Sequence, residues 1–274
     1  KTALSREQDG TGWSIDLSLP QATYEFKFTL GSWETVQVSK AGNDVGNNSI
    51  NLKCDTSLLF SIDAWKNEFD VLPKKHTASN NVQIMDTAFQ MQQLNTHSRI
   101  WIYLPPGYAQ AKKSYPVLYM HDGQNIFDEY TSGFGEWGID ESLDSMIGNG
   151  TPACIVVGID NGPKRLNEYN PYNNERFGKG EGDAYVQFIA QTLKPYIDQH
   201  YKTLPQKENT IIAGSSMGVL ISYYAIVKYP YVFGKAGVFS PSFWIAPQMD
   251  SLTKANAGKL SGKYFFYMGG KESE

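Results

Sequence analysis

Two kinds of hydrophobic pattern divide the chain near residue 75. Before that point, short stretches alternate apolar and polar positions, and clusters of glycine, asparagine and serine separate them. Alternation with a period of two is typical of strands that bury one face. The stretches are 23–30, 35–39, 49–53 and 57–62. We therefore predict a small all-β, immunoglobulin-like sandwich domain over residues 1–75, followed by a polar linker over 76–87.

After the linker, the pattern changes to short, continuous apolar runs. Continuous apolar strands are typical of a parallel sheet that is buried on both faces. The first two runs, 88–94 and 99–104, are expected to form an antiparallel pair. Further runs lie at 116–120, 153–159, 210–213, 235–239 and 264–268.

Helical patterns separate these runs, and the clearest covers residues 184–201. Pro195 should kink this helix or divide it, because proline lacks the N–H that an interior helical position needs. Strands that alternate with helices predict an α/β sheet of the doubly wound type over residues 88–274. Ligands of such sheets bind at the carboxyl ends of the strands.

One pentapeptide carries the sharpest chemical signal. Gly214-Ser215-Ser216-Met217-Gly218 follows the apolar run 210–213 and precedes an amphipathic stretch at 219–228. A Gly-x-Ser-x-Gly pattern at a strand-to-helix junction forms a tight turn that exposes the serine hydroxyl. The start of the helix offers backbone N–H groups to a developing oxyanion. The pattern predicts Ser216 as a nucleophile.

Composition excludes some classes of partner. The net charge of -4 and the pI of about 5.6 argue against binding to nucleic acid or to an anionic membrane, which requires a basic face. No apolar run approaches the roughly 20 residues that span a bilayer. We expect a secreted or periplasmic protein whose signal peptide has been removed. Cys54 and Cys154 are expected to be free, buried thiols.

Polar residues gather where the predicted parallel strands end. His121-Asp122-Gly123-Gln124-Asn125 follows the run 116–120, and Ser240-Pro241-Ser242-Phe243-Trp244 follows the run 235–239. Asp160 ends the run between them, and Arg165 and Glu168 come shortly after it. An ion pair that holds this loop is the favoured interpretation of Arg165 and Glu168, with substrate binding as the alternative.

These loops, the nucleophile turn and the segment Tyr196-Ile197-Asp198…Tyr201 together resemble a known family over about residues 85–274. The chain is similar to the esterase family that holds feruloyl and acetylxylan esterases (carbohydrate esterase family 1), enterochelin esterases and mycolyltransferases. The resemblance implies an α/β-hydrolase fold with a Ser-His-Asp/Glu triad and no cofactor. It also implies roles for Ser216 as the nucleophile, Glu272 as the triad acid, and the backbone N–H groups of Met217 and Gln124 as the oxyanion hole.

The triad histidine is the departure from the family pattern. In this fold it follows the last strand, after the acid. The four histidines of the sequence lie elsewhere, at His76, His97, His121 and His200. We therefore expect the chain to be part of a longer protein, with its C-terminal strand and histidine loop beyond Glu274.

Aromatic residues mark candidate contacts with substrate. Phe243 and Trp244 follow a strand at the active edge, and a planar ring there suits stacking on a phenolic acyl group. Residues 24–34 resemble a starch-binding type of carbohydrate-binding module. Trp33 is then expected either to stack on a sugar ring or to pack at the edge of the sandwich.

A metal site is not expected, because no cluster of histidine, cysteine and carboxylate residues has ligand spacing. Glu136, Asp140 and Glu141 are interpreted instead as the acidic first turn of a helix.

The sequence thus predicts a serine carboxylic ester hydrolase that acts on feruloyl or acetyl esters of plant polysaccharide or related sugars. Its expected partners are a small-molecule or polysaccharide ester and a glycan on the N-terminal domain, with no nucleic acid and no membrane. The alternatives are a catalytically inactive carbohydrate-binding protein, and a siderophore esterase or acyltransferase of the same family.

Overall fold

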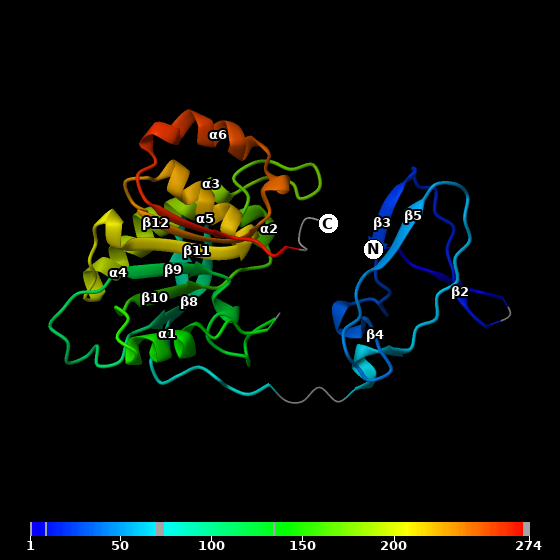
Figure 1. The fold of residues 1–274 in the computed structure, drawn as a ribbon, viewed down its shortest axis with the longest axis horizontal. Coiled ribbons are helices and arrows are strands. Elements are labelled where there is room, and N and C mark those ends of the chain that lie inside the picture. Colours follow the sequence, from blue (N-terminus) through cyan, green and yellow to red (C-terminus); the bar gives the residue numbers. More distant parts are fainter. Residues whose placement is uncertain (1, 9, 70–73, 134, 271–274) are drawn as a thin grey trace. The chain divides into compact units, whose positions relative to one another are not determined.

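The computed structural model describes residues 2–8, 10–69, 74–133 and 135–270. The chain forms two compact units, Lys1–Pro73 and Lys74–Glu274, drawn in Figure 1. Within the described residues, no helix is both long enough and apolar enough to cross a membrane.

The first unit contains short antiparallel strand pairs. The pairs are β1 (Ser5–Arg6) with β2 (Trp13–Ser14), β3 (Ala22–Phe26) with β5 (Asn48–Leu52), and β4 (Gln37–Val38) with β6 (Ala64–Trp65). Two 3-10 turns, η1 (Trp33–Thr35) and η2 (Lys66–Glu68), complete the unit. The sandwich stays a prediction, because the strands form three separate two-stranded sheets.

The prediction of a strand over 57–62 was wrong. This segment has no ladder hydrogen bonds, and it contributes to a cluster of aromatic rings instead. The ring of Phe60 lies 5.3 Å from that of Phe26 and 5.4 Å from that of Phe28, centroid to centroid. Phe60 therefore packs without strand pairing, while Leu58 and Leu59 of the same segment are exposed.

The second unit is built on a seven-stranded sheet in the order β13-β12-β11-β9-β10-β8-β7. Its strands are β7 (Val82–Met91), β8 (Thr96–Tyr103), β9 (Val117–His121), β10 (Ile155–Ile159), β11 (Thr210–Ser216), β12 (Lys235–Pro241) and β13 (Lys263–Tyr267). Strands β9 to β13 are mutually parallel, while β7 and β8 form an antiparallel pair at one edge. The mostly parallel sheet and its antiparallel pair confirm the α/β prediction.

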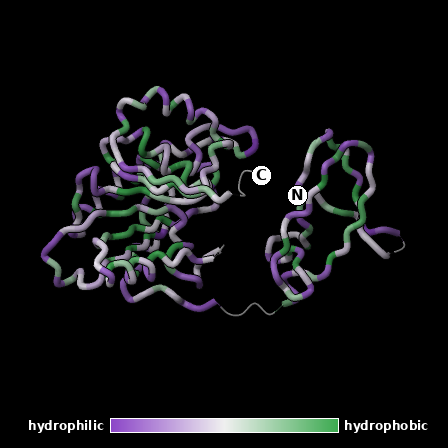
Figure 2. The backbone as a smooth tube through the Cα atoms, in the orientation of Figure 1, coloured by the Kyte–Doolittle hydropathy of each residue, from purple (hydrophilic) through white to green (hydrophobic). Residues whose placement is uncertain are grey.

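The apolar runs became central strands because helices cover both faces of the sheet. All five residues of β10 are buried, and Figure 2 shows the same strands as the most hydrophobic part of this unit. Alternate residues face opposite ways, so Ile100 and Ile102 belong to one cluster while Trp101 and Tyr103 belong to the other. The carboxyl ends of β9, β10 and β11 therefore rest on a largely buried part of the sheet, whereas the edge strand β13 is mostly exposed.

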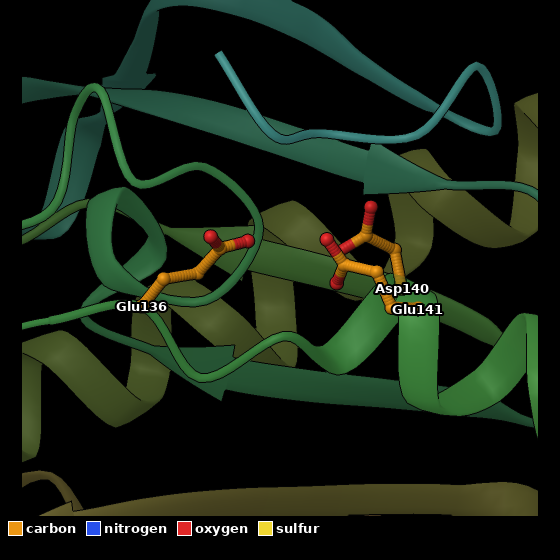
Figure 3. Close-up of side chains that lie close together, drawn as sticks. All are labelled: Glu136, Asp140 and Glu141. Atoms are coloured by element: carbon orange, nitrogen blue, oxygen red, sulfur yellow. The ribbon is translucent and has the colours of Figure 1, made fainter. Parts of the chain in front are cut away.

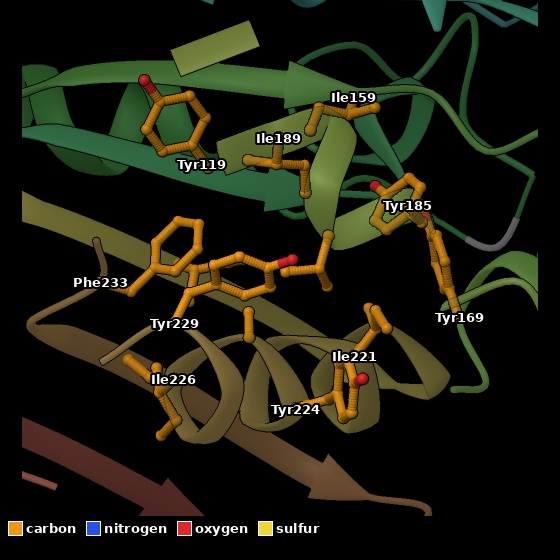
Figure 4. Packing of buried hydrophobic residues seen from close by; sticks show 14 of the residues in the cluster. Tyr119, Ile159, Tyr169, Tyr185, Ile189, Ile221, Tyr224, Ile226, Tyr229 and Phe233 are labelled. Carbon is orange, nitrogen blue, oxygen red and sulfur yellow. The ribbon is translucent and has the colours of Figure 1, made fainter. Parts of the chain in front are cut away.

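The helices are divided between the two faces. They are α1 (Ile139–Gly148), α2 (Arg165–Glu168), α3 (Gly182–Phe188), α4 (Lys194–His200), α5 (Met217–Lys228) and α6 (Gln248–Asn256). Helix α1 packs on the smaller cluster, and α3 and α5 pack on the larger one. Figure 4 shows the larger cluster, to which Tyr185 from α3 and Ile221 from α5 both contribute together with Ile159 from β10.

Pro195 does not divide the predicted helix. The chain passes from α3 through a π-helical turn, Ile189–Leu193, directly into α4, whose first turn contains Pro195. Proline has no N–H to donate, and the wider π-helical turn just before it interrupts the regular α-helical hydrogen bonds that this N–H would have continued. The thiols differ from expectation as well. Both are free, but Cys54 is exposed and Cys154 is partly buried just before β10.

Candidate active site

The predicted nucleophile lies on a strained turn. Strand β11 ends at Ser216, and α5 begins at the next residue, Met217. Ser216 has φ 56° and ψ −117°, a backbone conformation that a residue with a Cβ adopts only when its surroundings hold it there. Its side chain is exposed at the carboxyl edge of the sheet. The local fold thus presents one hydroxyl at the position where ligands of such sheets bind.

The two glycines of the pentapeptide allow the strand and the helix to meet. A Cβ at Gly214 would lie 2.8 Å from the carbonyl carbon of Gly218. A Cβ at Gly218 would lie 3.3 Å from both the Cβ of His121 and a carboxylate oxygen of Asp122. The contact at Gly214 leaves no room for a Cβ, and the contact at Gly218 is tighter than ordinary packing, so a side chain there would require its neighbours to move by a few tenths of an ångström. The turn is therefore fixed by sterics from strand, helix and the neighbouring loop.

A second serine contacts the nucleophile. The Ser242 Oγ lies 3.0 Å from the Ser216 Oγ, and either hydroxyl can donate. Ser242 is 8% exposed and follows β12, the strand next to β11. The neighbouring Ser240 has a positive φ of 53°, which turns the chain toward the nucleophile. Sequence reasoning named this loop but assigned no role to Ser242. The small polar residue that follows Pro241 was the signal.

The opposite side of the nucleophile is formed by the loop after β9. Strand β9 pairs with β11, so the loop and the nucleophile turn lie at neighbouring strand ends. Asp122 has a φ of 58°, and the 3-10 turn η4 (Gly123–Asn125) follows it. The N–H groups of Gln124 and Met217 both lie in the first turn of a helical segment, where a backbone N–H has no intrahelical acceptor. Such amides can donate to an oxyanion, and their assignment as the hole stays a prediction.

Charge holds the loop after β9 in place. Asp122 accepts two hydrogen bonds from Arg165, at 2.6 Å from Nε and 2.8 Å from Nη2. The Arg165 guanidinium also lies 5.0 Å from the centre of the Tyr169 ring. The prediction that Arg165 pairs with Glu168 was therefore wrong. Glu168 is buried, and burial raises the pKa of its carboxyl.

The next loop is fastened in a similar way. Asp160, at the end of β10, accepts from Arg99 Nε at 2.7 Å and from Trp101 Nε1 at 2.8 Å. Burial raises the pKa of Asp160, while Arg99 acts in the opposite direction. The Gln124 side-chain amide donates to Asn161 Oδ1, and the Asn161 backbone N–H donates back to Gln124 Oε1 at 3.2 Å. These bonds hold the Gln124 loop on the sheet edge.

The histidines keep other partners. His121 is buried beneath the nucleophile turn, its Nδ1 lies 2.9 Å from the Tyr185 hydroxyl, and burial lowers its pKa to about 3. His76 Nδ1 contacts Asp128 at 2.8 Å, and His200 Nδ1 donates to a backbone carbonyl at 2.8 Å. Within the described residues, no hydrogen bond joins a histidine to Ser216.

The aromatic candidates differ in exposure. Phe243 packs with its ring centroid 5.1 Å from that of Tyr223, so it is largely part of the core. Trp244 is 74% exposed beside it. Trp33 is 65% exposed in the first unit. The predicted acid Glu272 lies outside the described residues.

Comparison with known families decides the class of this chain. The family model Esterase matches residues 91–261, which is more than half of the sequence. The chain belongs to this esterase family. It is therefore a carboxylic ester hydrolase by family, and the matched residues include the nucleophile turn and both flanking loops.

The esterase is similar in sequence to two bacterial proteins, of which one is named as a feruloyl esterase. It is 28% identical over 181 residues to the uncharacterized protein YbbA of Bacillus subtilis (strain 168), covering 64% of this chain and 68% of that protein. It is 26% identical over 165 residues to an endo-1,4-beta-xylanase/feruloyl esterase of Xylanibacter ruminicola, covering 59% of this chain but only 22% of that larger protein.

Solved structures show the same fold. The esterase superimposes on the BES protein from Bacillus cereus with a TM-score of 0.57 and 18% identity, covering 74% of this chain and 79% of that one. It superimposes on the siderophore hydrolase EstA from Aspergillus nidulans with a TM-score of 0.56 and 18% identity, covering 70% and 69%.

Proposed function

We propose that the esterase is a serine hydrolase and that Ser216 is its nucleophile. The observation that carries the proposal is the strained, exposed Ser216 at the junction of β11 and α5. Strain of this kind persists only where the surroundings determine it, and it gathers at sites where the strain serves function.

The proposed reaction is acyl transfer in two steps. The Ser216 Oγ attacks the ester carbonyl carbon, its proton passes to a general base, and the carbonyl oxygen becomes an oxyanion. The N–H groups of Met217 and Gln124 stabilise that oxyanion, and loss of one such donor typically costs about 100- to 1000-fold in rate. The alcohol leaves with a proton, and water then releases the acid from the acyl-enzyme.

The general base is proposed to be a histidine oriented by Glu272. His121 is unsuited to the role, because burial lowers its pKa to about 3, which makes it a very weak base, and its Nδ1 is bonded to Tyr185. His76 and His200 are held by Asp128 and a backbone carbonyl.

We infer that the acyl group is aromatic or small and that it is attached to a plant polysaccharide or a related sugar. Trp244 is exposed two residues beyond Ser242, and Trp137 meets the Phe239 ring edge-on at 5.9 Å, next to Ser240. Flat rings at this edge suit a feruloyl group. The Xylanibacter relative, a feruloyl esterase by its name, supports this substrate class. A polysaccharide substrate agrees with the expected secreted or periplasmic location.

A fluorophosphonate probe tests the nucleophile. We expect the intact protein to be labelled, and Ser216→Ala to lose both labelling and at least about 1000-fold of its p-nitrophenyl acetate turnover. Ser215→Ala is the matched control, since this serine precedes the nucleophile in the same strand. Equal labelling of Ser216→Ala and wild type would refute the proposal.

Substrate choice is tested by comparing kcat/KM for methyl ferulate with kcat/KM for an aliphatic ester of similar size. Trp244→Ala should lower the ferulate value about tenfold, the effect of losing an aromatic stacking contact, and leave the aliphatic value nearly unchanged. Equal losses on both esters would count against the aromatic acyl group.

Binding of soluble glucans and xylans to Trp33→Ala and wild type, measured by affinity electrophoresis, tests the glycan site.

A further inference from the structure

Three acidic side chains converge at the start of helix α1. Glu136 lies in the loop before the helix, and Asp140 and Glu141 lie in its first turn. One carboxylate oxygen from each lies within 4.8 Å of those from the other two. Figure 3 shows the carboxylate of Glu136 pointing across a short gap toward the other two carboxylates. The fold thus gathers three like charges that the sequence spreads over six positions.

Glu136, Asp140 and Glu141 are called the acidic cluster below. Two of its carboxylate oxygens are buried without a hydrogen-bond partner among the described residues. Asp140 is fully buried, and its Oδ2 accepts from the Ser79 backbone N–H at 2.7 Å. Its Oδ1 has no hydrogen-bond partner within the part of the chain that the structure describes. The Glu136 Oε2 accepts from the Thr77 hydroxyl at 2.6 Å, while its Oε1 is likewise buried and unpartnered there. A buried carboxylate oxygen left in this way is costly unless a cation or a donor meets it.

Neighbouring cations do not neutralise the cluster. Among the described residues, no ion pair is formed by any of the three carboxylates. The nearby basic groups are engaged elsewhere, His76 with Asp128 at 2.8 Å and Lys74 with Glu129 at 4.0 Å. The start of α1 supplies a partial positive charge of about one half, which is small against three negative charges, and it has no side-chain cap hydrogen bond.

We propose that Glu136, Asp140 and Glu141 bind a calcium ion. All the ligands are hard oxygen atoms, which suit Ca²⁺ or Mg²⁺ and not the softer transition metals. An ion at the centre of three oxygens up to 4.8 Å apart lies up to about 2.8 Å from each of them, which is nearer to the Ca²⁺–O distance of about 2.3–2.6 Å than to the Mg²⁺–O distance of about 2.0–2.1 Å. Glu141 is exposed, so water can complete the coordination shell.

The site is linked to the loop that carries Gln124. The Trp137 N–H donates to the Asn125 carbonyl at 2.9 Å, and the Ile139 N–H donates to the Ile126 carbonyl at 3.1 Å. A calcium ion would therefore fix the start of α1, the segment around Ser79, and the loop beside the nucleophile. Sequence reasoning expected no metal, because it found no cluster with ligand spacing and interpreted these three residues as the acidic first turn of a helix. Gly138, whose φ of 59° is positive, lies between Glu136 and the other two carboxylates.

Terbium luminescence and thermal unfolding test this proposal on the intact protein. Tb³⁺ has the oxygen preference and size of Ca²⁺, and Trp137 is adjacent to Glu136 and can sensitise its emission. We expect saturable emission on excitation of tryptophan, displacement by Ca²⁺ with a Kd of about 10⁻⁴ to 10⁻³ M, and a rise in Tm at saturating Ca²⁺.

Two variants distinguish binding at this cluster from nonspecific binding to surface carboxylates. Glu141→Gln is exposed and should fold, and it should weaken Ca²⁺ binding at least about tenfold. Glu208→Gln, an exposed glutamate far along the chain, should bind Ca²⁺ as the wild type does. The proposal is overturned if Ca²⁺ leaves the Tm unchanged, if Glu141→Gln keeps the wild-type affinity, or if Mg²⁺ displaces Tb³⁺ at a lower concentration than Ca²⁺ does.

Discussion

Acidification should destabilise the second unit through a single buried histidine. The His121 ring packs between Tyr169 and Tyr185, with centroids at 5.3 and 5.5 Å. Its Nδ1 contacts the Tyr185 hydroxyl, and its buried Nε2 has no partner among the described residues. Burial, followed by the nearby charge of Arg165, lowers its pKa to about 3. The folded protein therefore keeps this ring neutral where the unfolded chain protonates it.

The sign and size follow from proton linkage. An exposed histidine has a pKa near 6.5, so below that pH the unfolded chain binds one proton more than the folded protein does. The free energy of unfolding then falls by about 1.4 kcal/mol for each pH unit between about 6.5 and 3. This stability is fully present above pH 6.5 and is lost as the pH falls toward 3. Between pH 6.5 and 5 the expected loss is about 2 kcal/mol.

Urea unfolding of the wild type and of His121→Asn, at about pH 7 and about pH 5, measures this contribution. The wild type should lose about 2 kcal/mol more than the variant does over this interval, because both share every other titrating group. His200→Gln, which changes an exposed histidine, should behave as the wild type does. If His121→Asn loses as much stability on acidification as the wild type, the reasoning from burial fails.

Three further changes probe the active edge. Gly214→Ala should lower the free energy of unfolding by about 1–3 kcal/mol, because its Cβ meets helix backbone that cannot move aside. Arg165→Met should cost about 3 kcal/mol in urea unfolding, since it leaves the mostly buried Asp122 carboxylate unpaired. Ser242→Ala should lower kcat about fivefold, the equivalent of about 1 kcal/mol for one hydrogen bond to Ser216, and leave the Tm nearly unchanged.

The changes at Gly214 and Arg165 each have a matched control. Gly148→Ala adds a methyl group where nothing lies within 4 Å, so its stability should equal or exceed that of the wild type. Lys164→Met removes an exposed pair with Glu181, 3.9 Å apart, and should cost at most about 1 kcal/mol. A Gly214→Ala protein as stable as Gly148→Ala, or a Ser242→Ala enzyme with wild-type kcat, would contradict the geometry described above.

The sheet of the second unit was predictable because burial on both faces leaves a plain mark on sequence. Runs such as 155–159 contain no polar side chain, and a strand buried on both faces is the structure in which such a short run is stable. The nucleophile turn was predictable for a different reason. Gly214 is dictated by contact with the backbone of Gly218, four residues along the chain, so local sequence contains this part of the constraint, whereas Gly218 meets His121 and Asp122 on the loop after β9.

Other features depend on contacts between distant parts of the chain, which no local pattern encodes. Arg165 was assigned to Glu168, three residues away, but the fold brings it to Asp122 on another loop. Ser242 acquired its place beside Ser216 only because β12 pairs with β11. In the first unit, short alternating stretches did not reveal which strands pair or that the segment 57–62 packs without pairing.

Arginine–carboxylate pairs, and not apolar contacts, hold the loops after β9 and β10, beside the nucleophile turn. Arg165 binds Asp122 and Arg99 binds Asp160 through directional hydrogen bonds, whereas the strands beneath these loops are stabilised by the burial of apolar side chains. Replacing either arginine by lysine would keep the charge but abandon the planar fork. Changes at these two arginines would therefore alter both the position of the loops and the free energy of unfolding, whereas changes in the apolar residues of the strands would act chiefly on the stability of the sheet.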